Sequence, residues 1–97
     1  MSPFEGTQIT IPEGVLHQHL GAETVLLHLT TETYYGLDEV GSRVWQLLQE
    51  HDTVDPIVAA LVSEYEVDEP ALRADLERLL EQLAETGLIH VERGPDG

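Results

Sequence analysis

The sequence predicts an α+β fold of the winged helix-turn-helix class, in which an N-terminal three-stranded antiparallel β-meander is followed by three helices. Two observations favour this class. Up to about residue 37 apolar residues recur at even spacing, as in half-buried strands, and beyond it they recur every three or four residues, as along amphipathic helices. In addition, the first two helical segments are joined by a turn at residues 51–53, and a longer third segment follows.

The β-like half of the chain consists of short segments separated by turn signals. Pro12 and Gly14 separate the first two segments, and Gly21 lies in a predicted hairpin turn. The last segment has the aromatic and β-branched residues of a short strand. Together they predict a small antiparallel meander drawn from residues 7–11, 15–20, 24–29 and 33–37.

The helical half contains three amphipathic segments, at residues 38–50, 53–65 and 69–86. Asp38 is placed to cap the first helix, Pro56 is tolerated in the first turn of the second, and Gly87 is a natural left-handed stop for the third. The third helix has an apolar stripe made of the leucines Leu72, Leu76, Leu79, Leu80 and Leu83. The apolar residues Leu88, Ile89 and Val91 are expected to pack back on the core or to form a last short strand.

Length and composition predict one small domain. The chain has 97 residues, of which 41% are hydrophobic, and we expect a core at about residues 15–91 and a frayed tail at 94–97. It has no cysteine, which excludes a disulfide framework and a thiolate nucleophile. It also lacks a signal peptide and an apolar run long enough to cross a membrane, so a soluble cytoplasmic protein is expected.

The charge of the chain argues against DNA binding, which is the usual function of a helix-turn-helix domain. Four basic residues face 19 acidic ones, a net charge of −15. In the helix that would enter the DNA groove, Arg73 and Arg78 are outnumbered by the acids Glu69, Asp75, Glu77, Glu81 and Glu85, a local balance of two minus five. Because phosphate contacts require several cations, neither nucleic acid nor an anionic membrane is expected as a partner.

The order of motifs resembles a known family. Residues 25–29 (VLLHL) and 33–48 (TYYGLDEVGSRVWQLL) are similar to the strand, tyrosine-glycine-leucine turn and first helix of the PqqD-like proteins, also called RiPP recognition elements. Residues 75–89 (DLERLLEQLAETGLI) are similar to the closing helix of that family. The likeness covers about residues 15–91. Within the family, a free-standing chain of this kind looks most like the leader-binding proteins of lasso-peptide biosynthesis.

The resemblance implies a binding protein and not an enzyme. It would hold the leader of a ribosomally made precursor peptide and present it to a transglutaminase-like leader peptidase and a cyclase, with no cofactor and no metal. The leader would add as a strand to residues 32–35, against the third helix. The implied contacts are Glu32, Thr33, Tyr34, Tyr35, Leu72, Asp75, Leu76 and Leu79, with charge contacts at Glu69, Arg73 and Arg78.

Physical reasoning refines these contacts. Alternation along a strand sends one of Tyr34 and Tyr35 inward and the other outward, so at most one is expected to touch the peptide with its side chain. The leucines of the third helix have a plainer interpretation as core residues. The acidic surplus, beyond making a solvated surface, predicts a basic leader whose binding weakens with salt.

Other functions stay open at this stage. One is a PqqD-type chaperone that holds its peptide for a radical enzyme in quinone-cofactor biosynthesis, and another is a general winged-helix interaction domain. A three-histidine zinc site at His17, His19 and His28 is a further alternative, although no Glu-x-x-His motif completes it. Ser42 lies inside a predicted helix, and it is therefore not placed as a nucleophile.

Overall fold

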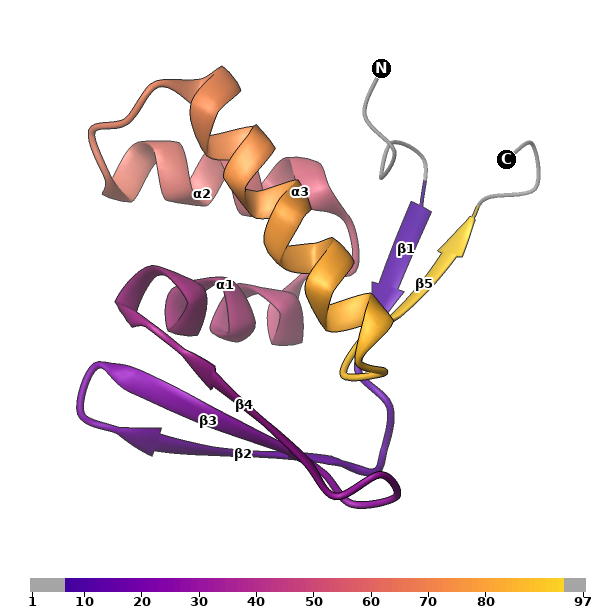
Figure 1. Cartoon of the computed structure of the whole chain (residues 1–97). Helices are drawn as coiled ribbons and strands as arrows, with labels where there is room; N and C mark the ends of the chain where they lie inside the picture. The colour runs from indigo at the N-terminus through magenta and orange to yellow at the C-terminus, as the bar shows by residue number, and fades with distance from the viewer. Residues whose placement is uncertain (1–6, 94–97) are drawn as a thin grey trace.

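The computed structural model describes residues 7–93, which form two small antiparallel sheets and three helices. In chain order the elements are β1 Thr7–Thr10, β2 Val15–Leu20, β3 Glu23–His28, β4 Thr33–Leu37, α1 Glu39–Glu50, α2 Val54–Glu64, α3 Glu69–Glu85 and β5 His90–Arg93. Figure 1 shows α1 lying over one face of the β2–β4 sheet, with α2 on the far side of α1 and α3 crossing beside it. Within residues 7–93 no helix is both long and apolar enough to cross a membrane.

The three-stranded sheet has the order β2-β3-β4 and is buried on one face only. Leu26 and Thr24 of β3 are fully buried toward α1, whereas the side chains of Leu16 and Tyr34, which lie in register with Leu27, are exposed on the outer face. A slip of one residue would exchange these two faces, so burial against α1 stabilises the observed register. The predicted antiparallel meander is therefore present in β2, β3 and β4.

The first predicted segment does not belong to the meander. Instead β1 pairs with β5 in a separate two-stranded sheet, with Ile9 opposite Val91. The chain turns between β1 and β2, and Leu88 and Ile89, both buried in the core, bring residues 90–93 back beside β1. The expectation that residues 7–11 extend the meander was thus wrong, because the pairing depends on a contact between the two ends of the chain. The winged helix-turn-helix class stays a prediction, and the predicted tail at 94–97 lies outside the described residues.

The helix boundaries follow from capping chemistry. Asp38 caps α1 as predicted, since its Oδ1 accepts a hydrogen bond from the Gly41 N–H at 2.8 Å. At the end of α3, Gly87 has φ +79°, and the N–H groups of Gly87 and Leu88 donate to carbonyl oxygens of the last helical turn at 3.1 and 2.9 Å. This is a Schellman motif, and it turns the chain toward β5.

The core lies where α1, α2 and α3 meet the inner face of the sheet. Trp45 of α1 is only 1% exposed. It belongs to a cluster with buried residues from every helix and from both sheets, among them Leu26, Ile57, Leu61 and Leu80. Burial of such side chains, at about 25 cal/mol per Å² of apolar surface, supplies the main force that holds the elements together.

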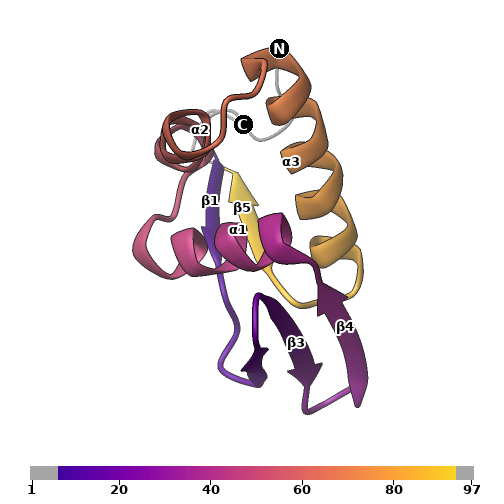
Figure 2. The ribbon, with the colours of Figure 1, turned by 90° about the vertical axis from the view of Figure 1, so that its left-hand side faces the viewer.

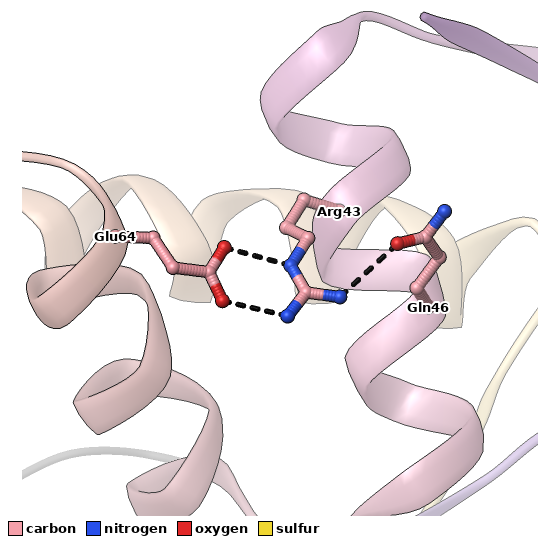
Figure 3. A network of polar contacts seen from close by, with 3 residues as sticks. All are labelled: Arg43, Gln46 and Glu64. Carbon is pink, nitrogen blue, oxygen red and sulfur yellow. Dashed lines mark hydrogen bonds and ion pairs between the residues drawn. The ribbon is translucent and has the colours of Figure 1, made fainter.

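An ion pair links α1 to α2 on the surface. Arg43 donates from Nε and Nη2 to the two carboxylate oxygens of Glu64, at 2.7 and 2.6 Å, and from Nη1 to Gln46 at 3.1 Å (Figure 3). The hydrogen bond to Arg43 holds the pKa of the Glu64 carboxyl below its ordinary value of 4.5. A bidentate pair of this kind fixes the relative orientation of the two helices.

The substitution Glu64→Gln is expected to remove part of the loss of folding stability that the protein undergoes as the pH falls. Because the folded-state pKa of Glu64 is lowered, its contribution to stability is present above pH 4.5 and is lost as the pH falls through the lower folded-state value. Urea unfolding at several pH values should show the variant less stable near neutrality and equal to the unaltered protein in acid. The control is Glu85→Gln at the end of α3, and a constant difference at every pH would contradict the assignment.

Candidate functional site

A cleft of about 600 Å³ lies between β4, the first turns of α1 and the face of α3. Figure 2 shows β4 at the edge of the sheet nearest α3, with β3 inside it. The cleft walls are mainly apolar, from Leu37, Val40, Val44, Leu61, Leu72, Leu76 and Leu79, and its charged lining residues are Asp38, Asp75 and Arg78. An apolar groove beside a sheet edge can bind an extended chain.

The hydrogen-bond pattern shows which backbone groups of β4 face the open edge. The Leu29 N–H donates to the Gly14 carbonyl oxygen at 2.8 Å, and hydrogen-bonded pairs recur at every second residue, so odd-numbered residues of β3 face β2. The even-numbered residues of β3 therefore face β4, where they pair with odd-numbered residues. Consequently the N–H and C=O groups of Tyr34 and Gly36 point away from β3, toward the open edge.

The two tyrosines have different environments. Tyr35 is half-buried, lines the cleft and donates its hydroxyl to Oε1 of Gln82 at 2.7 Å, which ties β4 to α3. Tyr34 is 70% exposed and lies on the outer face of the sheet. The predicted alternation is confirmed, and Tyr35 is the one that faces the cleft.

The leucines of α3 divide into core and cleft residues. Leu80 and Leu83 are fully buried and do not line the cleft, so the plain core interpretation holds for them. Leu76 lines the cleft, but its side chain is only 3% exposed, so it belongs both to the core and to the wall of the cleft. Leu72 and Leu79 are half-buried cleft residues whose exposed surface is available to a ligand.

Of the predicted charged residues, Asp75 and Arg78 line the cleft, and they pair with each other at 3.3 Å. Arg73 does not reach it, because its guanidinium bonds Asp55 of α2 at 3.2 Å and Glu69 at 3.7 Å. Arg73 thus connects α3 to α2 outside the cleft, and Glu69 pairs with Arg73 within α3.

The predicted strand at residues 32–35 is shifted in the structure. Glu32 has φ +57° and lies in the turn before β4, which runs from Thr33 to Leu37. The Thr33 hydroxyl accepts a hydrogen bond from the Thr31 hydroxyl at 2.9 Å, and Thr33 is not a cleft residue. The placement of Glu32 in the strand was therefore wrong, since a left-handed residue ends strand geometry.

Sequence reasoning missed the contribution of α1. Val40 and Gly41 line the cleft, and a Cβ at Gly41 would lie 3.2 Å from both the Leu37 side chain and the Asp38 carboxylate. Glycine therefore lets the first turn of α1 approach the end of β4. The signal was available in the sequence, because a helix cap directly after a strand requires the helix to start beside that strand.

The three-histidine site is not formed. His17 and His19 lie together on the inner face of β2, with ring centroids 5.3 Å apart. His28 lies elsewhere, beside Gly87, and its Nδ1 is 3.4 Å from the Thr31 N–H. Among residues 7–93 no group of three or more histidine, aspartate or glutamate side chains could hold a metal ion.

Comparison with known proteins gives a family and two related structures. Residues 23–89 match the family model described as coenzyme PQQ synthesis protein D (PqqD). The structure of TbiB1 in complex with the TbiA(beta) leader peptide is similar, with 46% identity, a TM-score of 0.80, and coverage of 84% of this chain and 94% of that chain. A lasso peptide synthetase B1 complexed with its leader peptide has 22% identity, a TM-score of 0.76, and coverage of 84% and 96%, and it supports the fold. Among curated proteins there is no significant match.

Truncation of Leu76 and of Leu79 to alanine should show which of the two side chains contributes more to the stability of the core. Leu76→Ala is expected to lower the free energy of unfolding by about 2–5 kcal/mol, because it leaves a cavity in the core. Leu79→Ala should cost roughly half of that or less, since its side chain is only half-buried. Urea unfolding measures both, with Leu80→Ala as the reference for a full core deletion. Equal losses at Leu76 and Leu79 would contradict this division.

Proposed function

The chain belongs to the PqqD family, and we propose that it binds the leader segment of a ribosomally synthesised precursor peptide without acting on it chemically. The observation that carries the proposal is an open β4 edge facing an apolar cleft, in a chain 46% identical to a protein whose structure contains a leader peptide. A binding role also fits a site whose lining is mainly apolar.

The leader adds to β4 as a further strand. Its backbone pairs with the N–H and C=O groups of Tyr34 and Gly36, which supplies affinity that does not depend on sequence. Leader residues opposite Tyr35 point into the cleft, where Leu72 and Leu79 provide apolar contact. The Tyr35 to Gln82 hydrogen bond joins β4 to α3 and holds the two walls of the cleft together. Tyr34 contributes its main chain and not its side chain.

The bound leader is presented to maturation enzymes. The proposed partners are a leader peptidase of the transglutaminase-like type and a cyclase, acting in the cytoplasm on a lasso-peptide precursor. Binding by main-chain pairing at an edge strand holds the leader extended along one side of the protein. The rest of the precursor then remains outside the cleft, where an enzyme can act on it.

A second function within the family is a peptide chaperone for a radical enzyme in quinone-cofactor biosynthesis, which the description of the family model favours. The similarity to TbiB1 over 84% of this chain favours the lasso-peptide role. A general winged-helix interaction domain is a third alternative, and the genes adjacent to this one distinguish the first two roles. A precursor gene with peptidase and cyclase genes indicates the first role, and quinone-cofactor genes indicate the second.

Strand addition is tested at Gly36. The substitution Gly36→Pro removes an N–H that points to the open edge and leaves the β3–β4 pairing intact. We expect it to weaken binding of a fluorescein-labelled leader peptide about tenfold or more, through loss of a hydrogen bond and obstruction by the ring. Fluorescence anisotropy gives the dissociation constants.

The matched control is Gly36→Ala, which keeps the N–H and adds a Cβ that has no atom within 4 Å. It should bind the leader as the unaltered protein does. If proline and alanine variants bind equally well, and circular dichroism shows both folded, the leader does not pair with β4.

The charge of the cleft predicts a basic leader. Asp38 and Asp75 outnumber Arg78 among the charged lining residues, and the chain as a whole carries −15. Raising the ionic strength should therefore lower the leader affinity, chiefly through a slower association rate. Anisotropy titrations at low and high salt measure this, and identical affinities would show that the acidic surplus only keeps the protein solvated.

A further inference from the structure

The edge of the sheet opposite the cleft is also open. In Figure 1 the strand β2 forms the outer border of the sheet, on the side of β3 opposite β4. Since even-numbered residues of β2 hydrogen-bond to β3, the N–H and C=O groups of His17 and His19 point outward. These two residues present four unpaired backbone groups, which is a template for another strand.

The strand carries none of the usual features that prevent edge pairing. Its sequence VLHQHL contains no lysine, acid or proline. On its outer face the side chains of Leu16 and Leu20 are 50% and 55% exposed. None of the 19 acidic residues of the chain lies on β2. The strand therefore suits a partner that offers an uncharged edge of its own.

The β2 strand of a second copy of the chain is such an edge. Two β2 strands can pair antiparallel in one register that satisfies their free backbone groups and also covers their exposed leucines. If two β2 strands pair antiparallel about a two-fold axis at Gln18, His17 of each copy lies opposite His19 of the other, and all four free residues hydrogen-bond. The same register places Leu16 opposite Leu20, so the exposed leucines cover each other. A shift of two residues in either direction places a leucine opposite Gln18, so neither shifted register pairs Leu16 with Leu20.

On the inner face this pairing would collect four imidazoles. Within one copy the rings of His17 and His19 are 5.3 Å apart, and two imidazoles bound to one tetrahedral zinc, with Zn–N of about 2.0–2.1 Å, have centroids about 5 Å apart. Nδ1 of His19 lies 3.0 Å from the Thr24 hydroxyl oxygen, which orients that ring and leaves Nε2 available. One copy supplies only these two ligands, so the site is incomplete without the second.

We propose that His17 and His19 of two copies bind one zinc ion across a β2–β2 interface, joining the copies into a six-stranded sheet. Imidazole is a preferred ligand of zinc, and four of them complete its tetrahedral shell. The strand order of the dimer is β4-β3-β2-β2-β3-β4. Both β4 edges, and with them both clefts, stay open at its two ends, so dimer formation and peptide binding are independent.

The primary test is the mass of the untagged full chain with and without zinc. Sedimentation equilibrium in EDTA should give the monomer mass of 10.8 kDa, and added Zn²⁺ should raise it to twice that value with one zinc bound per two chains. His17→Gln with His19→Gln should keep the monomer mass in zinc. His90→Gln, which removes an exposed histidine from β5, should dimerise as the unaltered protein does. A monomer in zinc, or dimers in the double variant, would overturn the proposal.

A second pair of variants tests the interface while retaining both histidines. Leu16→Glu with Leu20→Glu places carboxylates opposite each other in the proposed register and should return the mass in zinc to 10.8 kDa. The matched control is Val67→Glu, which alters an exposed apolar residue outside the sheet. If the double variant still dimerises in zinc, histidines of loosely associated copies bind the metal and the β2–β2 interface is wrong.

The absence of cysteine allows a direct check of the register. Gln18→Cys places two thiols opposite each other in a non-hydrogen-bonded pair, where the Cα separation of about 4.5 Å permits a disulfide. We expect rapid crosslinking in zinc under mild oxidation and slow crosslinking in EDTA. Val67→Cys should crosslink slowly in both. Equal rates for the two variants would rule out this register, and circular dichroism of each variant verifies that it is folded.

Discussion

One-sided burial of the three-stranded sheet is the constraint on which the rest of the molecule depends. Because the inner face packs on α1 through residues such as Leu26, the register of β2, β3 and β4 cannot slip without exposing the core. That register decides which side chains face inward, and it also decides which backbone groups point to each open edge. Tyr35 in the cleft and the His17 and His19 pair at the opposite edge are consequences of the same alternation.

The cleft itself arises where a strand passes directly into a helix. Asp38 directly follows β4 and caps α1, and Gly41 lets the first turn approach the strand. The third helix crosses beside β4, and the hydrogen bond from the Tyr35 hydroxyl to Gln82 joins the two elements near the end of α3. The apolar surface of Leu72 and Leu79 is left partly exposed in the cleft.

Much of this arrangement was accessible to reasoning from the sequence. The helix starts and ends, the Asp38 cap and the Gly87 stop were predicted because they rest on local chemistry. The pairing of β1 with β5 was not predicted, since it joins the two ends of the chain and has no local signal. Similarly, the role of Arg73 depends on its distance from Asp55 on another helix, so it was placed in the site although it ties α3 to α2.

By itself the sequence determined the types and order of the elements, the acidic surface, and the resemblance that indicated a peptide-binding family, since periodicity, capping and charge are properties of neighbouring residues. Only the tertiary structure decided that Tyr35 and not Tyr34 faces the cleft, that Leu80 and Leu83 belong to the core, and that the backbone of Gly36 points to the open edge. These features depend on which face of the sheet α1 covers and on the angle at which α3 crosses it. Both are set by side-chain packing between elements far apart in the chain, which no local pattern records.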